Sequence, residues 1–202
     1  RRQRQMCIRD SDYMAIVGQS LGLIYGYEFD GIYQYSDFYS VPGSSTLILK
    51  EGVTSNPSLG NRLSPGAVKY KDQDGDGVIT TKDRTVIGNA LPKWYGGITN
   101  TFNYKGIDFS FMLQFNYGND IYNATRLYAT QTNTQRRNQL AEVADRWSPT
   151  NASNKVPRYN GYVVNDVYSR FVEDGSFLRL KNITLGYTPV SYTHLRAHET
   201  AA

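Results

Sequence analysis

The sequence predicts an all-β fold of antiparallel strands, and three observations carry this prediction. The 202 residues include 17 Tyr, 8 Phe and 18 Gly, a composition typical of strands joined by turns. Residues 107–117 alternate between apolar and polar side chains, a period of two that a helix does not produce. Lys105-Gly106 separates this segment from a similar one before it and can form a tight hairpin turn.

Composition also excludes several classes of protein. No run approaches the roughly 18 apolar residues of a membrane-spanning helix, so a helical membrane protein is excluded. The single Cys excludes a disulfide framework and cysteine-rich zinc sites. Abundant aromatic residues with 20% charged residues argue against a disordered chain.

The two ends of the chain differ in character from the middle. The first eleven residues hold four Arg and the single Cys, and the stretch from Val190 onward holds both His. Both stretches resemble translated sequencing-adapter read-through, so 1–11 and 190–202 are expected to be non-biological and 12–189 to be the biological part. We therefore expect no nucleic-acid partner for the basic start and no chemistry from Cys7 or the two His.

The expected elements follow from these patterns in chain order. Apolar, aromatic and Gly-punctuated sequence at 14–35 indicates short strands and turns. The others are a possible short strand at 46–50, strands at 93–104 and 107–117, a short helix at 139–147 and a last strand at 177–187. In that last strand Leu178 and Leu180 are out of phase with the apolar face formed by Ile183, Leu185 and Tyr187. Either a β-bulge near Lys181 or burial of the strand start under a loop explains the shift.

The amphipathic hairpin has two interpretations. In a soluble sandwich its apolar face would pack on a second sheet. In a transmembrane β-barrel the same face would contact lipid, and aromatic residues would lie near both ends of the strands. The very short turn at 105–106, the long connection over 118–168 and the aromatic residues at both strand ends suit the barrel, but the pattern by itself leaves both open.

The acidic loop 71–84 matches the spacing of an EF-type calcium loop. Carboxylates recur at the first, third and fifth positions, and Gly77 stands where a sharp turn needs positive φ. The expected oxygen ligands are Asp72, Asp74, Asp76, the Val78 carbonyl, Thr80 and Asp83. Ile79 is expected to anchor the loop in the core. Because no EF-hand helices flank it, the sequence predicts a structural Ca²⁺ site rather than a switch, and a solvated Asp/Gly turn is the alternative.

Catalysis has little support in the sequence. Glu28, Asp30 and Asp37 could form the paired carboxylates of a glycosidase, but nothing in the pattern places them in one pocket. We therefore predict no catalytic residue and no enzyme. Tyr122, Tyr128, Tyr159 and Tyr162 are expected mostly to pack within loops, with stacking on sugar rings or packing on a partner as the alternatives.

Several segments together resemble one family. GLIYGYEFDGIYQ at 22–34, the stretch 64–123 from the acidic loop to GNDIYN, DRWSPTNASNKVPRY at 145–159 and SRFVEDGSFLRLKNITLGYT at 169–188 are similar to segments of SusC/RagA-type TonB-linked outer-membrane proteins of Bacteroidota. The resemblance covers nearly all of 12–189. It identifies the chain as a C-terminal barrel fragment of a TonB-dependent receptor.

The resemblance implies a barrel of about 22 strands with a plug, located in the cell outer membrane. Such a protein imports oligosaccharides or peptides with a SusD-like surface lipoprotein as lid and the TonB system as energy source. About three to five antiparallel strands are expected here, too few to close a barrel, with long extracellular loops and outer-membrane lipid around them. The plug and TonB box are absent from this chain. The alternatives are a secreted soluble carbohydrate-binding β-domain with a structural calcium loop and a glycosidase fragment.

The resemblance also orients the strands. Transmembrane barrels have short periplasmic turns and long extracellular loops. The turn at 105–106 is then periplasmic, and the acidic loop and the segment 118–168 are extracellular.

Overall fold

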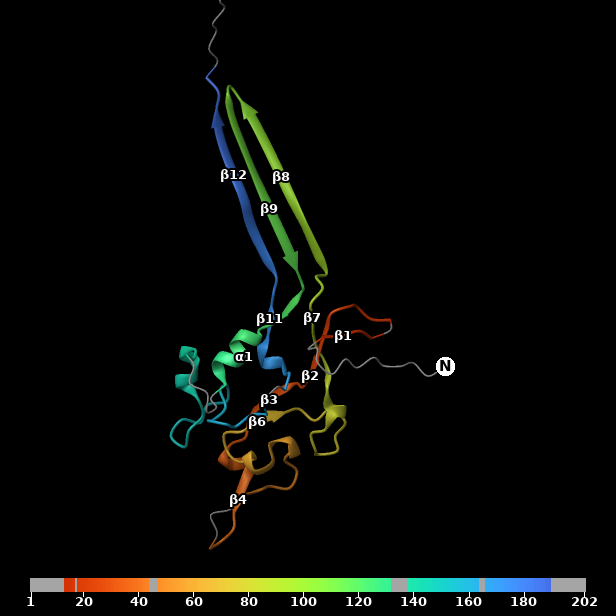
Figure 1. Ribbon diagram of the computed structural model, residues 1–202, viewed down its shortest axis with the longest axis vertical. Coiled ribbons are helices and arrows are strands. Elements are labelled where there is room, and N and C mark those ends of the chain that lie inside the picture. The colour runs from red at the N-terminus through yellow and green to blue at the C-terminus, as the bar shows by residue number, and fades with distance from the viewer. Residues whose placement is uncertain (1–12, 17, 44–46, 132–137, 164–165, 190–202) are drawn as a thin grey trace, which may run out of the picture. The chain divides into compact units, whose positions relative to one another are not determined.

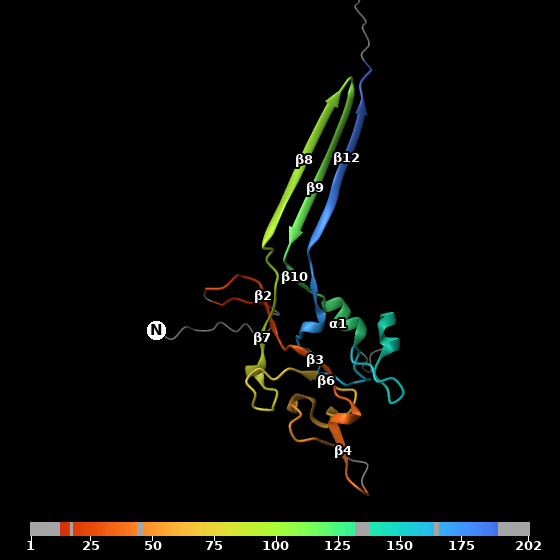
Figure 2. The same cartoon turned by 180° about the vertical axis from the view of Figure 1, so that it is seen from behind.

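The computed structural model describes residues 13–16, 18–43, 47–131, 138–163 and 166–189 (Figures 1 and 2). The stretches 1–11 and 190–202 lie outside the described residues, so their non-biological origin stays a prediction. The described residues confirm the all-β class: most regular elements are strands, and their one α-helix is α1 (Ala124–Thr130). No helix in these ranges is long and apolar enough to cross a membrane.

The chain divides into two compact units, which we describe separately. The sheet unit comprises Lys93–Tyr117 together with the segment that begins at Ser176. The loop unit comprises the described residues up to Pro92 together with Gly118–Gly175.

The sheet unit is a three-stranded antiparallel sheet in the order β12-β9-β8 (Figure 1). Its strands have eleven residues each: β8 (Trp94–Tyr104), β9 (Ile107–Tyr117) and β12 (Phe177–Tyr187). Lys105 and Gly106 join β8 to β9 with φ of 47° and 82°. A two-residue turn in which both residues have positive φ matches the right-handed twist of the flanking strands. Gly adopts a positive φ without steric strain. The N–H of Thr188 donates to the Gly106 carbonyl at 2.6 Å and ties the end of β12 to this turn.

Of the two explanations for the phase shift in β12, the structure shows the bulge. Leu180 pairs with Leu113, and Asn182 pairs with Met112, the adjacent residue of β9. Two steps along β12 thus match one step along β9, so Lys181 is the extra residue in the ladder. One inserted residue reverses the side-chain alternation on either side of it. Leu178 and Leu180 therefore share the apolar face of the second half of the strand, and burial under a loop is not the explanation.

The loop unit contains short paired strands. They are β1 (Tyr13–Met14), β2 (Leu23–Gly26) and β7 (Thr85–Asn89) in one sheet, and the pairs β3 (Phe29–Ile32) with β6 (Val68–Tyr70), β4 (Phe38–Ser40) with β5 (Leu47–Leu49), and β10 (Asp120–Tyr122) with β11 (Val172–Asp174). The strand expected at 46–50 is confirmed as β5. Five 3₁₀ helices occur among the described residues: η1 (Tyr35–Asp37), η2 (Pro57–Arg62), η3 (Thr81–Asp83), η4 (Ala141–Asp145) and η5 (Ser169–Phe171).

The helix expected at 139–147 is only the 3₁₀ helix η4, because Leu140 and Arg146 adopt extended backbone and leave five residues between them. The sequence analysis missed α1. Its start is fixed by the Asn123 side chain, which accepts a hydrogen bond from the Arg126 N–H at 2.8 Å and caps the helix.

Aromatic rings in contact with one another form part of the core of the loop unit. The Tyr27 and Tyr70 rings stack at 4.8 Å with 4° between their planes, and Tyr168 packs against Tyr70 at 5.4 Å. Phe171, fully buried, meets Tyr168 edge-on at 5.0 Å. Of the loop tyrosines considered above, Tyr122 and Tyr162 are buried, whereas Tyr128 and Tyr159 are about half exposed.

Candidate functional site

One face of the three-stranded sheet is apolar along its length, except for Gly96 and the polar Asn100 of β8, which lies opposite Phe111. From β8 it carries Trp94, Ile98, Phe102 and Tyr104; from β9 Ile107, Phe109, Phe111, Leu113, Phe115 and Tyr117; and from β12 Leu178, Leu180, Ile183, Leu185 and Tyr187. The members from β8 and β12 are between 50% and 73% exposed. A sandwich would cover such a face with a second sheet, and the described residues of the sheet unit form only this one sheet. We call these fifteen residues the apolar face.

The apolar face has aromatic residues near both ends. Trp94 pairs with Tyr117 at one end, and Tyr104 and Tyr187 flank Ile107 at the other. The first and last residues of each strand are ten residue steps apart, which corresponds to about 33 Å at about 3.3 Å per step. Tilted by about 40°, such a strand rises about 25 Å, which is the height of the apolar band of an outer-membrane barrel.

The opposite face of the sheet is mainly polar. It carries Thr99, Thr101, Asn103, Asp108, Ser110, Gln114, Asn116, Arg179, Asn182 and Thr184. Tyr95 and Phe177 are its aromatic members and flank Asn116. The Arg179 guanidinium lies 5.0 Å from the centre of the Phe177 ring. This amphipathic character is what a wall between lipid and a wet lumen requires.

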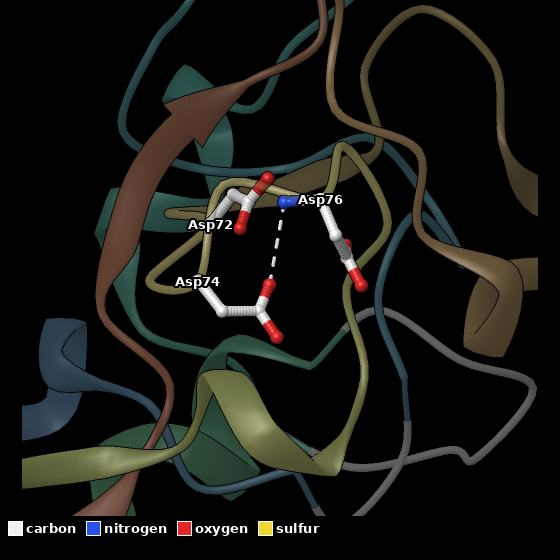
Figure 3. Close-up of side chains that lie close together, drawn as sticks. All are labelled: Asp72, Asp74 and Asp76. Atoms are coloured by element: carbon white, nitrogen blue, oxygen red, sulfur yellow. Dashed lines mark hydrogen bonds between the residues drawn. The ribbon is translucent and has the colours of Figure 1, made fainter.

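The acidic loop brings three of the six expected calcium ligands together. Asp72, Asp74 and Asp76 each offer a carboxylate oxygen, and these oxygens lie within 4.8 Å of one another (Figure 3). The Asp72 carboxylate accepts the N–H of Gly75 at 2.6 Å and of Gly77 at 2.7 Å, which curls the loop around it.

The other expected ligands hold the loop in place. Asp83 is fully buried and outside that group of three: one oxygen accepts the Gln73 N–H at 2.9 Å and the other the Thr80 N–H at 2.7 Å. The Thr80 hydroxyl accepts the Lys82 N–H at 3.2 Å. Val78 forms a bridge with Ser55, and Ile79 is buried in the core as the sequence predicts.

The charges of the loop act on its carboxyl groups in opposite ways. Loss of hydration raises the pKa of Asp74, and the negative charges of Asp76, Asp83 and Asp72 raise it further. The hydrogen bond from the Asp76 N–H acts in the opposite direction but is outweighed. Burial opposes ionisation of Asp83, but the backbone N–H groups that it accepts outweigh burial and lower its pKa. The buried Asp83 carboxylate thus stabilises the backbone of the loop, whereas Asp72, Asp74 and Asp76 repel one another. A bound cation would neutralise that repulsion.

The acids considered for catalysis have other partners. Glu28 accepts from Lys71 at 3.2 Å and from Gln73 at 2.9 Å, and these two hydrogen bonds, Gln73 first, lower its pKa. Asp30 pairs with Lys69 at 3.3 Å, and Asp37 accepts the Gln34 N–H at 2.9 Å. Each of the three carboxylates therefore has a hydrogen-bond or ion-pair partner of its own.

A charged cluster that the sequence analysis missed lies in the loop unit. Arg126 on α1 donates twice to Glu142, at 2.8 and 2.9 Å, and once to Glu173 at 3.0 Å. These hydrogen bonds, that to Glu142 first, raise the Arg126 pKa. The three residues come from separate elements, so no local spacing indicates the cluster.

Comparison with known proteins identifies the family. No family model matches the chain. Two TonB-dependent receptors of Formosa agariphila are 36% and 35% identical to it over 85% and 84% of its length. The TonB-dependent receptor SusC of Bacteroides thetaiotaomicron is 29% identical over 59% of the chain. The chain belongs to the SusC-type TonB-dependent receptors. Such receptors are transporters rather than enzymes.

The chain is a segment of a receptor of this family. It spans 16%, 15% and 11% of the lengths of these three relatives. The apolar face and the acidic loop are therefore features of one part of a TonB-dependent receptor.

Proposed function

We propose that the intact receptor is an outer-membrane importer driven by the TonB system, and that β8, β9 and β12 form part of its barrel wall. The observation that carries the proposal is the exposed apolar face, bordered by aromatic residues and backed by a polar face. Outer-membrane lipid would cover the apolar face, and the polar face would line the lumen of the barrel.

The topology supports an extracellular position for the loop unit. A two-residue turn joins β8 to β9, whereas β9 and β12 are joined by residues 118–176 at the opposite strand ends. Long connections in outer-membrane barrels are extracellular. There they would meet a SusD-like lipoprotein and an oligosaccharide or peptide substrate.

Cysteine labelling on intact cells tests this orientation. Thr150 and Lys105 are both exposed, the first in the loop unit and the second in the hairpin turn. In the full-length receptor we expect a membrane-impermeant maleimide to label Thr150→Cys on intact cells. Lys105→Cys should react only after the outer membrane is permeabilised. Labelling of Lys105→Cys alone on intact cells would reverse the topology, and equal labelling of both would refute the spanning sheet.

We also propose that the acidic loop binds Ca²⁺ as a structural staple. The three converging carboxylates, the spacing of the loop and the raised pKa of Asp74 support it. Calcium would stabilise the rim of the receptor and perform no chemistry. Asp72, Asp74, Asp76, the Val78 carbonyl and Thr80 would be ligands, with Asp83 contributing to the site or anchoring its backbone.

Proteolysis of the full-length receptor tests the calcium proposal. Trypsin can cut the loop after the exposed Lys82. At a calcium concentration 100 times the Kd, binding should slow this cleavage about a hundredfold, because cutting requires an open loop. The double variant Asp74→Ala, Asp76→Ala, which removes two ligand oxygens, should lose this protection and behave in calcium as it does in chelator. Glu51→Gln, an exposed acid outside the loop, is the matched control and should keep the protection. Cleavage that calcium leaves unchanged in the parent would refute the staple.

A further inference from the structure

The loop unit contains a cavity of about 460 Å³ that neither the fold nor the acidic loop explains. Its volume lies in the range of small-molecule sites, about 300–1,000 Å³. Phe29 and the buried Val156 provide apolar wall, and charged side chains provide the rest. The wall draws on β3, α1, η4, η5 and the segment that contains Val156, so the fold of the whole unit assembles it.

Arg170 is the most notable group in this wall. Its side chain is only 8% exposed, and its Nη2 atom is buried without a hydrogen-bond partner. The nearest acid oxygen, Oε2 of Glu142, is 3.7 Å away, and that carboxylate is already held by two hydrogen bonds from Arg126. Leaving a buried charged donor unsatisfied is costly, which suggests that an acceptor from outside completes the site.

Two further groups define what that acceptor would be attached to. Lys155 lines the cavity as a second cation, and no carboxylate in the described ranges forms an ion pair with it. Glu142 and Asp145 line it as acids, and one Asp145 oxygen accepts from Asn151 at 3.0 Å. The cavity therefore offers free donors for one anionic group and carboxylate acceptors for hydroxyls.

We propose that this cavity binds an acidic sugar residue of the transported material. The sugar carboxylate would accept from Arg170 and Lys155, its ring face would pack on Phe29, and its hydroxyls would donate to Glu142 and Asp145. A ring that carries one negative charge and several hydroxyls fits both halves of the wall. A second negative charge would meet the two acids and be repelled. The proposal rests on the importer function and names a substrate class for it.

Calorimetry on the purified full-length receptor in detergent tests this site, with D-glucuronate, D-glucose and N-acetyl-L-glutamate as probes. Glucose differs from glucuronate only at C6, where a hydroxymethyl group replaces the carboxylate, and N-acetylglutamate carries two carboxylates on a peptide-like frame. We expect glucuronate to bind at least about tenfold more tightly than either, the effect of one or two charge-assisted hydrogen bonds. Equal binding of glucose would overturn the role of Arg170 and Lys155, and tighter binding of N-acetylglutamate would indicate a peptide site instead.

Variants locate the binding. Lys155→Gln should weaken glucuronate about tenfold and leave glucose unchanged, because it removes one charged donor. Lys50→Gln, another exposed lysine, lies outside the cavity wall and should have no effect. Arg170→Gln should weaken glucuronate binding further. If this substitution of a buried residue prevents folding, Lys155→Gln alone still tests the site. Glucuronate binding that survives both variants, or its absence in the parent, would refute the site. Because binding in detergent needs neither TonB nor a membrane, its failure is distinguishable from failure of the importer function.

Discussion

Replacing Phe111 by Arg in the full-length receptor is expected to prevent its assembly in the outer membrane. Phe111 lies near the middle of β9, packs against Phe102 and Phe109 at 6.3 and 5.9 Å, and belongs to the apolar face. If this face contacts lipid, the substitution places a guanidinium close to the centre of the bilayer, at a cost of about 2–4 kcal/mol. The measurement is the amount of heat-modifiable receptor in purified outer membranes.

Two control variants separate charge in lipid from other effects. Ser110→Arg places the same group one residue away on the polar face, where its cross-strand partners are the uncharged Thr101 and Thr184. It should assemble normally, since water can reach the lumen. Phe111→Leu should also assemble, because it keeps the apolar surface. If Phe111→Arg and Ser110→Arg assemble equally well, the faces have been assigned wrongly.

Phe171→Ala is expected to loosen the loop unit without removing the receptor from the membrane. Phe171 is fully buried and packs edge-on against Tyr168, whose ring contacts Tyr70. Truncating a buried Phe costs about 3–5 kcal/mol through lost burial and the cavity left behind. Limited proteolysis on intact cells should therefore cut the variant's loop unit much faster than that of the parent.

The matched control is Tyr128→Ala, which truncates an aromatic residue that is 50% exposed in α1. It should change the cleavage rate little. Phe171→Ala should still yield heat-modifiable receptor, because the sheet unit has its own ladder of hydrogen bonds and contains none of these rings. Loss of the receptor from the membrane would show that the two units do not fold separately.

The sheet could be predicted because its signal is local. Each β9 side chain faces one side or the other according to its place in the chain, so eleven alternating residues are enough to define both faces. The bulge at Lys181 was one of two explanations, since only the pairing with Leu113 and Met112 decides between them. A ladder register depends on the partner strand, which local periodicity does not report.

The loop unit was harder to predict because its order comes from distant contacts. Tyr27 stacks on Tyr70, and Tyr70 packs against Tyr168, about a hundred residues further along the chain. Short strands and 3₁₀ helices connect these rings. No periodic pattern accompanies such contacts. The convergence of Asp72, Asp74 and Asp76 followed from their spacing, whereas the backbone hydrogen bonds of Asp83 did not. The cavity around Arg170 has no local signature at all.

Spin labelling of the full-length receptor in lipid bilayers tests the central claim most directly. Labels introduced at Phe109, Phe111 and Leu113 should collide more with oxygen, which concentrates in the bilayer, than with a water-soluble nickel complex. Labels at Ser110, Met112 and Gln114 should not show this preference, so oxygen accessibility along β9 should alternate with a period of two. Protection of the first three positions from both reagents, as in a core between two sheets, would contradict the lipid-facing wall.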